Sequence, residues 1–188
     1  MEETPKNDKG NGEVHEGEST DEKAETPLSA LFMSKGVKLY HFTDEGNIES
    51  IKETGLVPWT EAQKIDGAKL TSNELSRQCD MENEVADYVR LCFRKDHPML
   101  YIAKEDGRIK KEAWISVSLE ILDVKGVKFC NKNAALKNAD IRESPEHLRW
   151  DLITIDTPFK YVPVEKKPFL QAEVLVPKKI DAKYLTFE

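Results

Sequence analysis

The chain has 188 residues, of which 39% are hydrophobic and 34% are charged, and its net charge is −7 at pH 7. That length fits one ordinary domain with a tail, and the acidic balance argues against binding duplex nucleic acid through one large basic face, although it is compatible with a local basic groove. No apolar run approaches the length of a membrane span and the N-terminus lacks an apolar signal core, so we expect a cytoplasmic protein without membrane contact.

The three cysteines, Cys79, Cys92 and Cys130, are irregularly spaced and form no CxxC pair. No histidines cluster near them, so the sequence predicts neither a zinc site nor another bound metal. An odd number of irregularly placed cysteines indicates reduced thiols, which agrees with a cytosolic location.

The N-terminal segment is polar and acidic. Residues 1–30 contain almost nothing apolar, so they cannot bury enough surface to offset the entropy of ordering the chain. We predict a disordered acidic tail over residues 1–34 and one folded domain over residues 35–188. A short helix over residues 27–33 would cap this domain.

Strand patterns dominate the domain. Alternation and β-branched or aromatic content predict strands at residues 37–43, 88–93, 99–103, 112–119, 127–130 and 169–177, with a final extended segment at 180–187. Helical patterns cover residues 47–54, 120–122 and 145–155. For the first of these, Thr43 or Asp44 is the expected N-cap and Gly55 the expected C-cap. Many short strands with one early helix predict an α+β fold built on twisted, mainly antiparallel sheets.

Glu173 lies within the last strand pattern, between Pro168 and Pro177. Alternation places Leu170, Ala172, Val174 and Val176 on one face and Gln171, Glu173 and Leu175 on the other. A carboxylate among apolar neighbours costs free energy unless it faces water or has a partner. Two interpretations stay open, an exposed residue on an edge strand and a catalytic carboxylate on a rigid wall of a cleft.

His41 and Thr43 share one face of the first predicted strand, where they could present two hydrogen-bonding groups to one ligand; a packed core histidine is the alternative. Residues 60–86 are polar and irregular, and such a segment inside a compact domain is often functional. It contains Arg77, whose guanidinium would suit a diphosphate if the loop folds over a cleft. Arg90 and Arg94 are the next arginine candidates. The chain contains neither GxGxxG nor GxxxxGK[ST], so neither standard phosphate loop is present.

Several segments together resemble the DarT family, NAD-dependent ADP-ribosyltransferase toxins that modify bases in single-stranded DNA. The matching segments, in family order, are residues 39–43 with Ile48, Ile51 and 55–56, residues 88–93 with 98–101, Phe129 with 133–134, residues 148–151, and residues 171–177. The ordered set covers about residues 37–185 and is more specific than any one of its pieces.

The resemblance implies an ADP-ribosyltransferase-like fold of two twisted, mainly antiparallel sheets around a cleft that holds NAD. It implies that His41 hydrogen-bonds the NAD ribose and that Thr43 lies in the pocket on the nicotinamide side. Arg77 matches the family's catalytic arginine and Glu173 its catalytic glutamate. Tyr101 could stack on the nicotinamide or on the base.

The function that this resemblance implies is transfer of ADP-ribose from NAD to a base in single-stranded DNA, by a toxin or phage-defence effector that an antitoxin protein neutralises. Two segments differ from the family pattern. Residues 82–87 are less basic, and Arg90-Leu91-Cys92 stands where other members carry a proline-containing strand. Transfer to RNA or to a protein therefore stays open, as does a non-catalytic module that binds NAD or nucleic acid.

Overall fold

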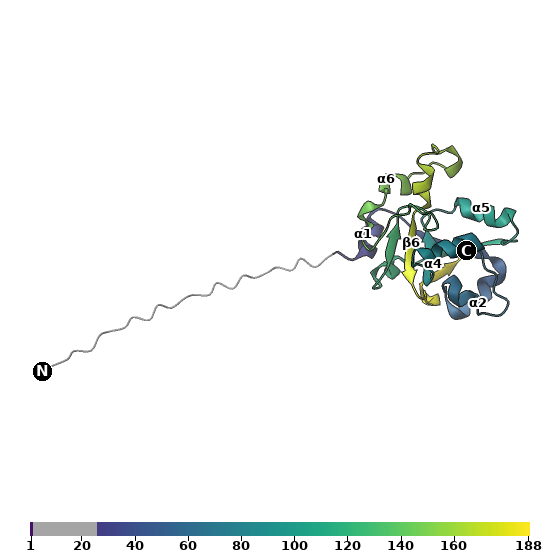
Figure 1. Cartoon of the computed structure of the whole chain (residues 1–188), viewed down its shortest axis with the longest axis horizontal. Helices are drawn as coiled ribbons and strands as arrows, with labels where there is room; N and C mark the ends of the chain where they lie inside the picture. Colours follow the sequence, from purple (N-terminus) through teal and green to yellow (C-terminus); the bar gives the residue numbers. More distant parts are fainter. Residues whose placement is uncertain (2–25) are drawn as a thin grey trace.

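The computed structural model of the chain describes Met1 and residues 26–188. In this part of the chain, one seven-stranded sheet crosses the domain (Figure 1). Its strands are β1 Leu39–Asp44, β2 Tyr88–Cys92, β3 Glu112–Val117, β4 Lys128–Cys130, β5 Ile141–Arg142, β6 Glu173–Pro177 and β7 Leu185–Phe187. They lie in the order β5-β4-β6-β2-β1-β3-β7, and the neighbouring strands pair antiparallel. With the helices below, this architecture confirms the predicted α+β class.

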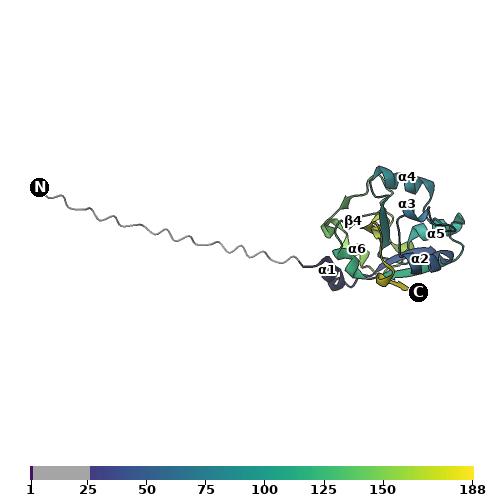
Figure 2. The same cartoon turned by 90° about the horizontal axis from the view of Figure 1, so that it is seen from below.

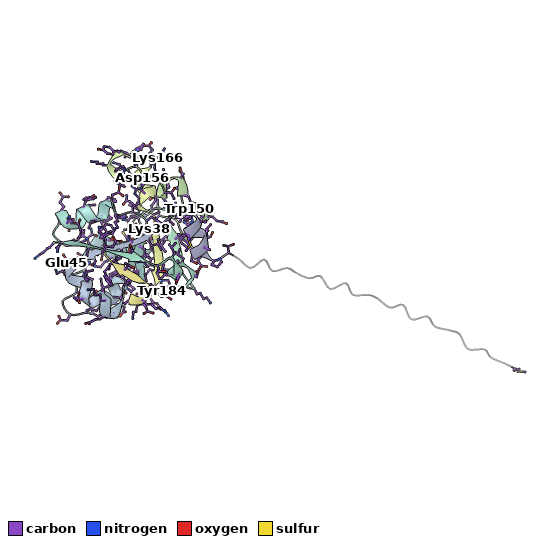
Figure 3. All side chains as sticks on the ribbon, turned by 180° about the vertical axis from the view of Figure 1, so that it is seen from behind. Lys38, Glu45, Trp150, Asp156, Lys166 and Tyr184 are labelled. Carbon is purple, nitrogen blue, oxygen red and sulfur yellow. The ribbon has the colours of Figure 1, made fainter. Side chains whose placement is uncertain are left out.

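The helices of the described residues are short. They are α1 Leu28–Ser34, α2 Ile48–Thr54, α3 Trp59–Ala62, α4 Glu74–Glu82, α5 Pro98–Glu105 and α6 Trp150–Ile153. The 3₁₀ turns are η1 Glu45–Asn47, η2 Leu119–Asp123, η3 Pro145–His147, η4 Phe159–Tyr161, η5 Lys167–Gln171 and η6 Ala182–Tyr184. Figures 1 and 2 both show α1 and α6 toward one end of the domain and α2 and α5 toward the other. The segment between α6 and β6, which carries Asp156 and Lys166, projects from the domain (Figure 3).

The sheet opens between β1 and β2. In the described residues these two strands share a single register pair, Tyr40 with Cys92, whereas β1 pairs with β3 along its whole length. On the other side, β2 pairs with β6 from Tyr88 to Cys92. We expected two separate sheets around a cleft; this is corrected to one sheet whose two halves remain joined at Tyr40 and diverge beyond it.

The helix α1 belongs to the folded domain. Its Phe32 is fully buried, and the Phe32 ring centroid lies 5.4 Å from that of Phe129 and 5.0 Å from that of Trp150. Burial of an aromatic side chain of this size contributes strongly to a core. The predicted boundary between tail and domain therefore moves from residue 34 to before Leu28, and the predicted short helix is confirmed. The rest of the predicted tail lies mostly outside the described residues.

Of the two predicted caps of α2, the C-cap Gly55 is confirmed, whereas Asn47 and not Thr43 or Asp44 occupies the N-cap position. Asp44 caps the preceding turn η1 by accepting a hydrogen bond from the Gly46 N–H at 2.9 Å, and α2 ends at Gly55. Gly55 has φ of +80°, and a Cβ there would lie 2.3 Å from the Ile180 carbonyl oxygen. Only glycine allows both this backbone conformation and this close approach. The contact joins the end of α2 to the segment that leads into β7.

Two predicted strands need correction. Residues 99–103 are helical and belong to α5, because His97 caps the helix and Pro98 occupies its first turn, where proline needs no N–H partner. The strand predicted at residues 169–177 begins only at Glu173, since η5 precedes it. Residues 145–155 form η3 and α6 as separate short turns. The other strand predictions agree with β1 to β4 within a few residues, and the final extended segment contains β7.

Candidate active site

A cavity opens where β1 and β2 diverge. Its walls come from β1, β2, the first residue of β6, α2, α3 and the loop over residues 65–73. The space free of atoms, with the open mouth included, amounts to about 1310 Å³. A concave site between secondary-structure elements is typical of small-molecule and cofactor binding.

Glu173 lines this cavity from the start of β6. It is only 6% exposed, because β6 is a central strand between β4 and β2. Its carboxylate oxygen Oε2 accepts a hydrogen bond from the Ala134 N–H at 2.9 Å and lies 3.7 Å from Nη1 of Arg90. Burial raises the pKa of Glu173, and the Arg90 charge and the Ala134 hydrogen bond oppose that rise. The interpretation of Glu173 as an exposed edge-strand residue is therefore wrong.

The loop after β4 holds the donor that Glu173 uses. Asn133 is 6% exposed and its Oδ1 accepts from the Ala135 N–H at 2.9 Å, which closes a tight turn. The Ala134 carbonyl accepts a hydrogen bond from Asn83 Nδ2 at 2.7 Å, so the turn is also fastened to the end of α4. Together these bonds hold the Ala134 N–H toward the carboxylate.

Arg90 forms a charge chain with Glu173 and Asp80. From β2 it reaches the carboxylate of Glu173 on one side and contacts the carboxylate of Asp80, on α4, on the other. Asp80 is 2% exposed, so its charge depends on this partner. Sequence reasoning ranked Arg90 behind Arg77, although Arg90 was already visible as a departure from the family's strand. Asp80 carried no sequence signal.

His41 lines the cavity from β1 and spans the opening of the sheet. Its Nδ1 lies 3.1 Å from the Arg90 carbonyl oxygen, which can only accept, so Nδ1 carries the proton. Burial lowers the pKa of His41, which keeps the ring neutral and leaves Nε2 as an acceptor. The site thus holds an acceptor suited to a ligand hydroxyl.

Thr43 lines the same wall and is 3% exposed. Its Oγ1 accepts from Asn47 Nδ2 at 2.9 Å, and Asn47 also bonds both backbone groups of Lys69 at 2.9 Å. The next residue, Asp44, accepts from Lys69 Nζ at 2.6 Å and from the Lys110 N–H at 2.8 Å. The Lys69 ammonium and these backbone donors hold the pKa of Asp44 far below its usual range. Asp44 and Asn47 therefore fix the loop over the cavity, a role that sequence reasoning missed.

The remaining two predicted site residues are not among the described residues that line the cavity. Arg77 lies behind its wall, where Nη1 donates to the Ser72 carbonyl at 2.6 Å and the guanidinium lies 5.8 Å from the Trp59 ring centroid. Tyr101 is 60% exposed on the outer face of α5. The structure thus brings Glu173, His41 and Thr43 to one cavity and leaves Arg77 and Tyr101 outside it.

Unpartnered polar atoms of buried side chains also belong to the cavity lining. Among the described residues, Trp59 Nε1, Ser72 Oγ and His97 Nε2 are buried without a hydrogen-bond partner, and all three residues line the cavity. Buried polar groups are normally paired, so such atoms indicate where a polar ligand binds. Within residues 26–188, no three histidine, cysteine or acidic side chains are grouped to hold a metal ion, and no helix is long and apolar enough to cross a membrane.

Comparison with solved structures supports this fold. A Thermosipho africanus DarTG in complex with ADP-ribose superposes with a TM-score of 0.64 at 23% identity, over 80% of this chain and 43% of that chain. A Thermus sp. 2.9 DarT in complex with ADP-ribosylated ssDNA gives a TM-score of 0.60 at 21% identity, over 77% of each chain. The same Thermus protein in complex with NAD+ gives 0.58 at 20% identity, over 79% of each chain. The chain thus spans less than half of the DarTG chain, and no curated protein matches its sequence.

A family model supplies the assignment. The model for DarT, described as ssDNA thymidine ADP-ribosyltransferase, matches residues 40–187, which include β1 with His41 and β6 with Glu173. That match covers most of the chain and confirms the resemblance seen in the sequence. The chain belongs to the DarT family of ADP-ribosyltransferases.

Proposed function

We propose that this protein transfers ADP-ribose from NAD to a thymidine base in single-stranded DNA. The observation that carries the proposal is the arrangement of Glu173, Arg90 and the neutral His41 in one cavity between β1 and β2 of a DarT-family fold. Relatives in complex with NAD+ and with ADP-ribosylated ssDNA support the same substrates.

The residues present fit NAD. The cavity is open to solvent at its mouth, and its lining contains both a histidine acceptor and unpartnered buried polar atoms. NAD supplies a ribose whose bond to nicotinamide breaks as positive charge develops on the ribose carbon. In this proposal His41 Nε2 accepts from a ribose hydroxyl, and Thr43, on the same wall, lies on the nicotinamide side.

Glu173 stabilises the positive charge that develops on the ribose carbon. Its buried carboxylate acts in a low-dielectric site, where a fixed charge is worth far more than it is in water. Arg90 and the Ala134 N–H help to keep it ionised, so that it also accepts the proton that the attacking base nitrogen loses. Tyr101 and Arg77 do not line the cavity among the described residues, so stacking of Tyr101 on the base and binding of the NAD phosphates by Arg77 remain predictions of the family resemblance.

A basic and aromatic segment before β6 supports a nucleic-acid substrate. The projecting segment before β6 places Lys160 Nζ 4.7 Å from the Tyr161 ring centroid and Lys167 Nζ 5.2 Å from that of Phe159. Tyr161 is 69% exposed, and this segment leads directly into η5 and the Glu173 strand (Figure 3). Exposed rings with neighbouring cations are the usual platform for unstacked bases. A base inside a duplex hides its ring nitrogen, so a single strand is the expected substrate.

The biological setting follows from the family. We infer a toxin or phage-defence effector that acts in the cytoplasm and is neutralised by an antitoxin protein. The free thiols of Cys79, Cys92 and Cys130 agree with a reducing compartment. The toxin role predicts that expression of the wild-type chain without its antitoxin arrests growth, whereas expression of Glu173→Gln does not.

The test is mass spectrometry after incubation of the full chain with NAD and matched oligonucleotides. Single-stranded and double-stranded DNA and RNA are compared, and DNA without thymidine serves as the substrate control. We expect an ADP-ribose adduct on thymidine-containing single-stranded DNA with wild type and none with Glu173→Gln. An adduct found only on RNA or only on protein would make that molecule the substrate in place of single-stranded DNA. NAD binding without nicotinamide release would identify a non-catalytic module.

A further inference from the structure

His97 is a buried polar residue of the cavity that the proposed mechanism does not use. It is 2% exposed, lines the cavity and precedes α5 as its N-cap. Its Nδ1 accepts a hydrogen bond from the Met99 N–H at 3.3 Å, while its Nε2 is buried without a partner among the described residues. One edge of the ring is therefore satisfied by the protein and the other is not.

The hydrogen bond between the Met99 N–H and His97 Nδ1 determines whether Nε2 is a donor or an acceptor. A backbone N–H can only donate, so Nδ1 must present its lone pair and the single proton of a neutral ring must sit on Nε2. Burial lowers the pKa of His97 to about 4, so the ring is neutral at physiological pH. Nε2 is thus a donor that cannot become an acceptor and cannot ligate a metal while the cap is in place.

The surroundings favour an uncharged acceptor. The Phe42 ring centroid lies 5.7 Å from that of His97, and Met99 lines the same part of the cavity. The charges of Asp96 and Arg90 also act on His97, with opposite signs. His97 itself offers a ligand one neutral N–H, which suits a carbonyl oxygen, whereas a buried phosphate charge needs more than one neutral donor. A fixed donor also discriminates, because it pairs with a carbonyl oxygen and leaves an amino group unpaired.

We propose that Nε2–H of His97 donates a hydrogen bond to an amide-type carbonyl oxygen of the bound substrate and so selects for it. This inference rests on the proposed function, whose two substrates both supply such oxygens, one in the carboxamide of NAD and two in the pyrimidine ring of thymine. These oxygens have the same chemistry, and kinetics with each substrate in turn separates them.

Two substitutions separate the helix-capping role of His97 Nδ1 from the proposed substrate contact of His97 Nε2. In His97→Asn the side-chain oxygen replaces Nδ1 and can still cap α5, but no donor reaches the place of Nε2. In His97→Gln the terminal NH₂ replaces Nε2 and the cap acceptor is lost. A structural role for His97 predicts that Asn retains more activity than Gln, whereas a substrate contact predicts the reverse.

The experiment measures KM and kcat for NAD and for a thymidine oligonucleotide, with thermal melting of each variant. We expect His97→Asn to keep the wild-type melting temperature and lose at least tenfold in kcat/KM. We expect His97→Gln to melt several degrees lower and to retain kcat/KM within about threefold. A rise in KM for NAD assigns the contact to the carboxamide, and a rise in KM for the oligonucleotide assigns it to the base. His147→Asn, outside the cavity lining, is the matched histidine control.

Equal activity of both variants, or greater activity of His97→Asn, overturns the proposal. Calorimetric titration with NAD and with the oligonucleotide distinguishes failure of the His97 proposal from failure of the proposed transferase function. If wild type binds a ligand without transfer, the proposed function fails, and weaker binding by His97→Asn than by His97→Gln still supports the contact. If wild type binds neither ligand, both proposals fail.

Discussion

Removing the Arg90 charge is expected to move the acid limb of the activity profile to higher pH. Glu173 must be ionised to stabilise positive charge, burial already raises its pKa, and Arg90 is the largest opposing influence. Arg90→Gln removes that influence, so the pKa of Glu173 rises further. On the acid side of the activity profile, a smaller fraction of Arg90→Gln molecules than of wild-type molecules then has Glu173 ionised.

The magnitude follows from the distance. Two charges 3.7 Å apart interact by about 4.5 kcal/mol at an effective dielectric constant of roughly 20. The Arg90 side chain is partly exposed to solvent, which screens this attraction, so we take about 2 kcal/mol as the influence that Arg90→Gln removes from Glu173. That corresponds to a loss of about thirtyfold in kcat/KM on the acid side of the limb, with the difference closing at high pH.

The assay is the initial rate of ADP-ribose incorporation into a thymidine oligonucleotide between pH 5.5 and 9. The double variant Asp80→Asn/Arg90→Gln is the control, because Arg90→Gln alone leaves the buried Asp80 carboxylate without its ion-pair partner. The double variant should recover part of the lost activity at low pH. An acid limb that stays in place, or that moves to lower pH, would refute the role given to Arg90.

Three further substitutions test other parts of the structure. Glu173→Gln should lower kcat by about 10³-fold without changing the melting temperature by more than a few degrees, as circular dichroism will show; near-wild-type turnover would exclude electrostatic catalysis by this residue. Asp44→Asn should lower the free energy of unfolding by about 2 kcal/mol at pH 7. The folded-state pKa of Asp44 is depressed, so this stability is present above the unfolded pKa and is lost as pH falls, and urea titrations should show the gap to wild type narrowing below about pH 4. Phe32→Ala should cost about 3–5 kcal/mol in the same titrations, with exposed Met33→Ala as the control; a loss under 1 kcal/mol would return α1 to the tail.

Local signals predicted what depends on local chemistry. Alternation placed Leu175 on the face opposite Val174 and Val176, and the structure puts Leu175 in one core cluster and the two valines in another. The burial of Glu173 was not predictable, because it depends on β6 lying between β4 and β2, and strand order is a tertiary property.

The sequence analysis predicted a strand where α5 lies and ranked Arg77 above Arg90. These two errors have different causes. The signal for α5 was present in the sequence, since His97 followed by Pro98 is a cap and a first turn, but the apolar content of residues 99–103 outweighed it. By contrast, nothing local indicates that Arg90 reaches Glu173 while Arg77 turns toward Ser72. That outcome depends on the register of β2 against β6 and on where α4 packs.

The register of the sheet also determines what surrounds the reacting carbon. Glu173 pairs with Cys92 on one side and with Cys130 on the other, so two thiols flank the carboxylate. Burial is the main cause that raises the pKa of each thiol to about 12, and the Glu173 charge adds to it. A thiolate is a strong nucleophile, and one at this place would compete with the DNA base for the ribose. In the proposed mechanism, the carboxylate that promotes the transfer also helps to keep both sulfur atoms protonated, which disfavours modification of the enzyme itself.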